Sequence, residues 1–575
     1  MMTISEFSRN AVCRYLRSVV LIDDNLFNAR ERHFRQDDLD LDGPPFLILN
    51  NDDVAPDLAT MTFGANENER RADDNWVDTR SVTDGFAKEG IVCGVYEPKE
   101  FPETNFESDD NFKTLLNVCT NADVFILDWH LFRGNQNENA VANLLKYILR
   151  EDNRNTSPKP VRFCAIYTAE RVDAICDKVY TECKQIESSA RQDVDARKVY
   201  AGGLTVCIYA KEEATSPGAV AAKDLAERII TDYAKAYEGI LPAMALRGIA
   251  SIRNNAKRIL DKFPREMDSA LLVHAGLTLE DPSVVEDVLV LLTDEVKSVL
   301  HDMAGFGNDV YALLIETLKK TDEAVFASLA ENADLVKPGV AAIQIKQYIV
   351  KSFESGGFVS DSPFTEQAYD CVSHKADKKL LSELQNVVVS AVGDVGRYKP
   401  GALSKLFCLR TVYSDKRVLK PGTIIRDTRT GAYHICLMPL CDSLRLGDEK
   451  IFFPFWKLSK ADDHEIGKAH GVVVDDEAGN IACLCLKGKI RNRMTLWRFK
   501  AENVVAFTKE GSKYVISESP KGQPTQGGTA QPPSKFEWVA ELKPFHAQRM
   551  AEYVSREFSR VGLTESEWLR QQVDR

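Results

Sequence analysis

Five polar residues near the start of the chain each follow a short apolar run, and their types suit phosphoryl chemistry. Asp23 and Asp24 come directly after RSVVLI, and Asp128 comes directly after ADVFIL. Thr168 follows VRFCAIY, and Lys211 follows LTVCIYA. Clustered carboxylates repel one another unless a cation is present, and a hard, oxygen-only site is what Mg²⁺ prefers. We therefore expect Asp23, Asp24 and Asp128 to hold Mg²⁺.

These residues can divide the work of phosphoryl transfer among them. One carboxylate oxygen can attack phosphorus in line while the metal neutralises the charge on the phosphoryl group. Asp128 is the expected nucleophile because it alone ends the central strand. Thr168 offers a hydroxyl to a phosphoryl oxygen, and Lys211 offers an ammonium to Asp128 or to the phosphate.

The elements that must position these residues follow an alternating pattern over residues 1–240. Short β-rich runs alternate with amphipathic helical stretches, which predicts a parallel sheet with helices on both faces. We expect strands at 17–22, 90–96, 122–127, 161–167 and 204–210. The five polar residues then stand at the carboxyl ends of strands, where such sheets bind ligands. Residues 28–88 are polar and Asp/Asn-rich, which predicts an inserted loop.

The residue pattern changes twice after residue 240. A chain of 575 residues is also too long to fold around a single hydrophobic core of ordinary size. Residues 241–400 show helical periodicity without strands, which predicts an all-α bundle. Residues 401–517 hold short strands separated by Gly, Asp and Pro, which predicts a small β barrel or sandwich. A flexible linker at 518–535 and a C-terminal helix within 536–575 complete the expected multidomain chain.

The order Asp-Asp, Asp, Thr, Lys at the ends of strands one, three, four and five resembles the receiver domain of two-component response regulators. The resemblance covers residues 1–240 and implies a flavodoxin-like fold, a phosphoryl group on Asp128, and Mg²⁺. It also implies regulated binding as output, so no enzymatic activity beyond self-dephosphorylation is expected. Two positions depart from the family pattern. Glu212 replaces the proline after the lysine, and Ile208 replaces the aromatic residue three places before it.

The divergence of this segment is similar to that of large receiver-like proteins of bacterial signalling or phage-defence operons. That resemblance implies a histidine-kinase-like or GHKL-type ATPase as partner. Phosphorylation would then alter the face formed by the fourth helix, fifth strand and fifth helix, which would control the helical and β domains. The alternative is a degenerate receiver that acts as a non-phosphorylated scaffold for such an ATPase. A homodimer is left open.

Two other interpretations of the acids explain less of the pattern. Asp23 and Asp24 could cap the next helix, but a cap predicts nothing about Asp128, Thr168 and Lys211. A haloacid-dehalogenase-type phosphatase would need a second Asp two positions after Asp23, where Asn25 stands.

The charge distribution bears on nucleic-acid binding. The net charge is −13, yet residues 401–500 carry 18 Lys and Arg against 11 Asp and Glu. A strand over 487–500 would place basic and aromatic side chains on one face, as single-stranded nucleic acids require. The residues of this face are Lys487, Lys489, Arg491, Arg493 and Trp497. A solvated strand face is the preferred interpretation, and nucleic-acid contact is the alternative.

The cysteines and the hydropathy pattern indicate a cytoplasmic protein without a membrane span. Thirteen cysteines are scattered without a CxxC pair, which is typical of reduced core thiols. No apolar run approaches the 18 residues that a spanning helix needs. A zinc site is not expected, because the spacings match no standard knuckle. The residues that could suggest one are His434, Cys436, Cys441, Cys483 and Cys485.

Overall fold

The computed structural model divides into two compact units, Met1–Val392 and Gly393–Arg575. It describes residues 3–24, 26, 77–102, 105–132, 139–154, 161–212, 218–277, 283–303, 307–331, 339–354, 401–443, 446, 450–461, 471–488, 490–502, 504–519 and 533–558. Most of the expected insertion at 28–88 and most of the expected linker at 518–535 lie outside these ranges. None of the helices that the structure describes is long and apolar enough to cross a membrane.

The first unit is built on a seven-stranded sheet with the order β2-β1-β3-β4-β7-β6-β5. The first five strands in that order are parallel to their neighbours. They are β1 (Ser18–Ile22), β2 (Val92–Tyr96), β3 (Val124–Leu127), β4 (Arg162–Thr168) and β7 (Leu204–Ala210). Every residue of β3, β4 and β7 is buried, as in parallel sheets covered by helices on both faces. The parallel α/β fold expected from the sequence is confirmed.

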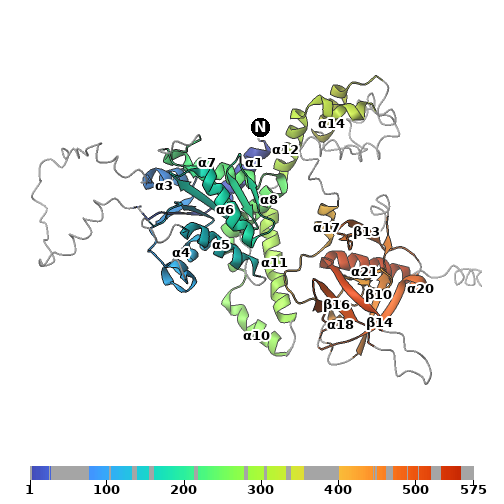
Figure 1. The fold of residues 1–575 in the computed structure, drawn as a ribbon. Coiled ribbons are helices and arrows are strands. Elements are labelled where there is room, and N and C mark those ends of the chain that lie inside the picture. Colours follow the sequence, from blue (N-terminus) through green and yellow to red (C-terminus); the bar gives the residue numbers. More distant parts are fainter. Residues whose placement is uncertain are drawn as a thin grey trace, which may run out of the picture. The chain divides into compact units, whose positions relative to one another are not determined.

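Two groups of helices cover the faces of this sheet (Figure 1). One face packs against α4 (Asp110–Asn121), α5 (Ala140–Asn153) and α6 (Val172–Ile186). The other face packs against α1 (Ile4–Tyr15), α3 (Thr79–Lys88) and α7 (Ala222–Ala236).

The helix α3 lies within the segment that we expected to be a loop, 28–88, so that expectation was wrong for its last ten residues. Asp78 caps the helix by accepting a hydrogen bond from the backbone N–H of Ser81, 3.1 Å away. Val82 and Phe86, one helical turn apart, are buried against the sheet. The polar composition of the preceding residues conceals this short amphipathic pattern.

A β-hairpin that the sequence analysis missed extends the sheet beyond β7. Its strands are β5 (Arg191–Asp193) and β6 (Lys198–Ala201), and β6 pairs antiparallel with β7. The Nζ of Lys198 lies 2.9 Å from Asp232 Oδ1, and Tyr209 donates its hydroxyl to Asp232 Oδ2 at 3.0 Å. All three side chains are buried. The hairpin is therefore fixed to α7, and β7 is not an edge strand.

From Ile240 to Glu354 the described residues form helices and short helical turns. The helices are α8 (Ile240–Asn254), α9 (Ala256–Leu260), α10 (Asp268–Leu277), α11 (Ser283–Met303), α12 (Gly307–Lys320), α13 (Ala327–Ala330) and α14 (Ala342–Glu354). The helix α8 packs along α1 and α11 contacts α8, so these helices continue the layer on the α1 side of the sheet. A small separate core joins α12 to α14 through Leu318, Phe326 and Ile349.

The second unit contains a seven-stranded antiparallel sheet with the order β14-β10-β9-β8-β17-β16-β15. Its strands are β8 (Thr423–Asp427), β9 (Tyr433–Cys436), β10 (Lys450–Lys457), β14 (Met494–Lys500), β15 (Thr508–Glu510), β16 (Lys513–Ser517) and β17 (Lys535–Glu541). A second, three-stranded sheet consists of β11 (Ser459–Lys460), β12 (Gly471–Asp475) and β13 (Ile481–Cys485). The β-rich character expected for this part of the chain is confirmed.

The second unit also contains helices. The first that the structure describes is α17 (Ala402–Cys408), and the short helices α18 (Leu440–Ser443) and α20 (Ile490–Arg493) lie between strands. The C-terminal helix α21 covers Pro544–Phe558, and Lys535–Glu541 belongs instead to β17, which pairs with β8. The first residues of the segment 536–575, in which we expected a C-terminal helix, therefore form a strand, and the helix begins at Pro544. Phe536 and Ala540 are buried on opposite faces of the sheet, so both faces gain from the strand conformation.

The large sheet of this unit separates two cores. Phe455, Trp497 and Phe499 lie in an aromatic core on one face. Trp456 faces the other core, which includes Met550 of α21 and Leu484 of the small sheet. Alternation along β10 and β14 produces this division. The imidazole of His434 also belongs to this aromatic core, because His434 is buried with its ring centroid 4.7 Å from that of Trp497.

This buried histidine makes stability depend on pH. Burial, with a smaller effect of Lys457, lowers the pKa of His434 from its ordinary 6.5 to about 4. The folded state therefore binds fewer protons than the unfolded state between these two values. The stability present above pH 6.5 is lost as the pH falls through this window.

We expect lowering the pH from 7.5 to 5 to cost the second unit about 2 kcal/mol through His434. The variant His434→Phe should lose that much less over the same pH change, as measured by urea unfolding of the full chain. His301→Phe serves as the control, because His301 is exposed and lies in the first unit, so its replacement should not alter the unfolding of the second unit. Equal pH dependence in wild type and His434→Phe would contradict this account.

Candidate functional site

Four of the five polar residues predicted from the sequence stand where parallel strands end together. Asp23 follows β1, Asp128 follows β3, Thr168 ends β4 and Lys211 follows β7. Strand register brings these ends level, because the N–H of Asp128 donates to Ile22 O at 3.2 Å. Likewise, the N–H of Lys211 donates to Thr168 O at 2.8 Å. All four side chains are buried.

A buried ammonium group lies between two buried carboxylates at this edge of the sheet. Lys211 Nζ is 2.9 Å from Asp128 Oδ2 and 3.8 Å from Asp23 Oδ2. The three side chains are only 1% to 2% exposed. Buried charges of this kind are tolerated only when they are paired, and the ammonium lies beside both carboxylates. Carboxylate oxygens at the end of a sheet are also a donor set that suits a hard cation such as Mg²⁺.

The two oxygens of Asp128 are in different situations. Oδ2 accepts a hydrogen bond from Lys211 Nζ. Oδ1 is buried, and no hydrogen-bond donor for it occurs among the residues that the structure describes. A buried acceptor without a donor costs free energy, which a bound cation or phosphoryl group would recover.

Asp24 differs from the other two acids because it lies in a turn and is partly exposed. Within the described ranges, no three or more His, Cys, Asp or Glu side chains are gathered so that they could hold a metal ion. The three acids expected together thus do not form one such group. Mg²⁺ commonly takes only one or two carboxylates and keeps several waters, so Asp23 and Asp128 with the Oδ1 acceptor still fit this ion.

Thr168 and its neighbours form the rim of the site. The Thr168 Oγ1 accepts a hydrogen bond from the N–H of Glu170 at 3.2 Å, which leaves the hydroxyl proton available to an incoming group. His130 Nε2 lies 3.7 Å from Glu170 Oε1, and both side chains are partly exposed. Sequence reasoning missed this pair. The sequence offers one indication of this pair. His130 stands two residues after Asp128, and Glu170 stands two residues after Thr168.

The aromatic residues near Lys211 are anchored away from the acids. Tyr167 donates its hydroxyl to Val220 O at 2.9 Å, and its ring centroid is 5.8 Å from Lys211 Nζ. Ile208, at the position where the family pattern has an aromatic residue, is buried in the core beside α5 and α6. Tyr209 is tied to Asp232 on the other side of the sheet. The aromatic hydroxyls of Tyr167 and Tyr209 therefore already have partners.

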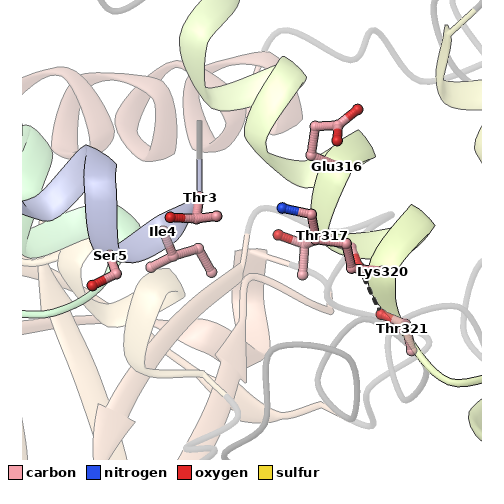
Figure 2. Close-up of a pocket in the computed structure, with 7 residues that line it drawn as sticks. All are labelled: Thr3, Ile4, Ser5, Glu316, Thr317, Lys320 and Thr321. Carbon is pink, nitrogen blue, oxygen red and sulfur yellow. Dashed lines mark hydrogen bonds between the residues drawn. The ribbon is translucent and has the colours of Figure 1, made fainter. Parts of the chain in front are cut away.

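A cavity of about 300 Å³ lies elsewhere in the first unit, between the start of α1 and the end of α12 (Figure 2). It is lined by Thr3, Ile4, Ser5, Glu316, Thr317, Lys320 and Thr321. None of the residues at the carboxyl ends of the strands lines it. Thr3 and Glu6 cap one another at the start of α1, so the Thr3 side chain already has a partner within the chain.

The basic and aromatic strand face expected over 487–500 does not occur. Residues Ile490–Arg493 form the short helix α20, and the strand begins only at Met494. Trp497 is 9% exposed and belongs to the aromatic core, so it cannot stack on a base. Lys487 precedes this helix, Arg491 and Arg493 lie in it, and Lys489 lies outside the described residues. The alternation that we took for one surface face instead buries its aromatic members.

The residues that suggested a zinc site are not gathered as ligands in the described structure. Burial raises the pKa of the Cys436 thiol to about 12, so this thiol is protonated in the core. The described cysteines form no disulfide.

Comparison with known proteins identifies a family for the segment that contains Asp23 and Asp128. Residues 15–216 match the family model described as a response receiver domain. This segment is therefore a receiver domain of the response-regulator kind, and the resemblance drawn from its strand-end residues is confirmed. No curated protein matches the chain. No solved structure matches it either.

The ammonium group of Lys211 should be essential to the stability of this domain. Lys211→Met would leave two buried carboxylates without their counter-ion, which should lower the free energy of unfolding by about 3–5 kcal/mol. Urea unfolding of the full chain measures the loss. Lys146→Met is the matched control, because Lys146 pairs with Glu182 at 2.8 Å in a partly exposed position and its loss should cost less than about 1 kcal/mol. Equal effects of the two variants would argue against charge balance by Lys211.

Proposed function

We propose that the receiver domain accepts a phosphoryl group on Asp128, with Mg²⁺ bound at Asp23 and Asp128, and that Asp24 moves toward them when the ion binds. Thr168 and Lys211 contact the phosphoryl oxygens. The protein then acts in response-regulator-like signalling, in which the phosphorylated state controls protein–protein contacts of the helical and β domains. The observation that carries this proposal is the buried Asp128 carboxylate, which has one oxygen held by Lys211 and the other without a donor among the described residues.

The geometry favours Oδ1 of Asp128 as the attacking atom. Lys211 fixes Oδ2, so Oδ1 retains the lone pairs for an in-line attack on phosphorus. A new bond forms between Oδ1 and phosphorus, and the bond from phosphorus to the donor breaks with its electron pair leaving on the donor. Oδ1 is buried in this structure, so transfer requires a movement that exposes it.

The remaining residues stabilise the charge that the transfer brings into the site. Mg²⁺, when bound, would offset the negative charge of the phosphoryl oxygens. The Lys211 ammonium can remain near Asp128 and also contact a phosphoryl oxygen, because lysine carries three donors. The free proton of the Thr168 hydroxyl can donate to a second oxygen. Each residue thus stabilises the phosphorylated state more than the unphosphorylated one, which is what a two-state signal requires.

A second function, that of a scaffold, is favoured by one observation. Lys211 already lies between Asp23 and Asp128, and the described residues hold no three-acid metal group. A receiver that keeps this arrangement permanently would bind a histidine-kinase-like or GHKL-type ATPase without accepting phosphate. Nucleic-acid binding through residues 487–500 is not favoured, because Trp497 is buried and is not available to stack on a base.

Incubation with Mg²⁺ and acetyl phosphate tests the main proposal. Attack by Asp128 releases acetate, so intact-mass analysis should show one added phosphoryl group on the wild-type chain and none on Asp128→Asn. Asp173→Asn, an exposed acid on α6, is the matched control and should be modified like wild type. A wild-type chain that gains no phosphoryl group would favour the scaffold function.

Binding of Mg²⁺ can be followed separately from phosphorylation through Trp129. This side chain is buried beside Asp128, so a cation at the site should change its fluorescence. Asp23→Asn should weaken Mg²⁺ binding by about tenfold or more. Trp129→Phe should remove the signal, which identifies its source. A Mg²⁺ response that is the same in wild type and Asp23→Asn would place the ion elsewhere.

A further inference from the structure

Two consecutive helices of the first unit expose large apolar side chains instead of burying them. On α10 these are Leu271, Leu272 and Val273, and on α11 they are Leu289, Val290 and Leu291. Their exposed fractions range from 40% to 71%. We call these six side chains the α10–α11 patch. Successive residues of a helix point about 100° apart, so each run of three covers a broad side of its helix.

The two helices form a hairpin at the side of the α/β body. Only residues 278–282 separate α10 from α11, and the two helices contact each other. Figure 1 shows α10 and the adjoining end of α11 extending away from the sheet, while the rest of α11 runs along the domain. Contacts with α8 and α9 hold α11 in place. The patch is therefore presented on a supported element.

We propose that the α10–α11 patch is the interface of a homodimer, in which the helical hairpins of two copies pack against each other as four helices. A pair of helices with an apolar side buries it most completely against another such pair. Two-fold association places the same patch on both partners, so an apolar surface meets an apolar surface without further requirements.

The apolar area of the α10–α11 patch is consistent with a homodimer interface. Six large apolar side chains, each about half exposed, present on the order of several hundred Å² of apolar surface, which is at or above what a monomer usually leaves open. A stable interface buries about 800 Å² on each partner, and the apolar part is only its centre. The patch with its polar surroundings therefore supplies what a dimer needs.

The charge around the patch argues against a membrane or a nucleic acid as the occupant. The exposed part of α11 beyond the patch carries Asp294 and Asp302 beside Lys297. The residues before and at the start of α10 carry both signs of charge, namely Lys257, Arg258, Lys262 and Arg265 with Asp261, Glu266 and Asp268. Helices that bind anionic lipid surfaces are rich in Lys and Arg on their polar side. Surroundings of mixed charge lack the excess of Lys and Arg that would attract lipid phosphates or nucleic acid. A protein is therefore the expected partner for the patch, and a second copy of this chain is such a partner.

Sedimentation velocity of the full chain over a range of concentrations tests the proposal. The wild type should sediment as a dimer, and both Leu272→Glu and Leu291→Glu should weaken the dimer by about 30-fold or more, since each buries a charge in the centre of the interface. Val194→Glu is the matched control. Val194 is an apolar residue that is 62% exposed in the β5–β6 turn, outside the patch, and its replacement should leave the dimer intact.

Hydrogen exchange of the wild-type chain keeps the test decisive if a variant misfolds. Amides of α10 and α11 should become less protected as the protein is diluted below the dissociation constant. Protection that is independent of concentration, in a chain that sediments as a monomer, would mean that another part of the same chain covers the patch and would overturn the proposal. A dimer that resists both glutamate variants would place the interface elsewhere and would also overturn it.

Discussion

The receiver domain depends on one charge arrangement, the Lys211 ammonium between the carboxylates of Asp128 and Asp23. Both acids are held at the end of the sheet by backbone hydrogen bonds of their strands, so neither can move into water to lower its energy. Buried charges in a medium of low dielectric constant are tolerated only when they are paired. The position of each of these three groups therefore depends on the other two.

The rest of the domain serves to keep this arrangement buried and in register. Five parallel strands place their carboxyl ends along one edge, and helices on both faces exclude water from the strands. The Asp232 carboxylate provides a second buried charge, paired with Lys198 and hydrogen bonded to Tyr209. The two clusters are close in sequence, since Tyr209 and Lys211 differ by two residues and point to different partners. A shift of the end of β7 would therefore be felt by both clusters.

The sequence predicted the features that repeat along the chain and missed those that depend on tertiary packing. Asp23, Asp128, Thr168 and Lys211 were predictable because each follows an apolar run that is long enough to be a buried strand. The hairpin β5–β6 was not, because Arg191–Asp193 has no apolar pattern and becomes a strand only by pairing with β6. At Trp497 the regular alternation predicted a strand, but it did not show which face of that strand is buried. Burial of that face is decided by Phe455 and Phe536, which are distant in sequence.

The hairpin also determines how other chains can approach the sheet. Its outermost strand, Arg191–Asp193, has three polar residues, of which Arg191 and Asp193 are exposed and oppositely charged. Short, charged edge strands resist the addition of a further strand from another molecule, because the incoming backbone would have to remove water from both charges. At this edge the domain is therefore protected against recruitment by β-strand addition and against sheet-to-sheet aggregation. At this edge, contacts with other proteins must then be made by side chains, and such contacts can be altered one residue at a time without disturbing backbone hydrogen bonds.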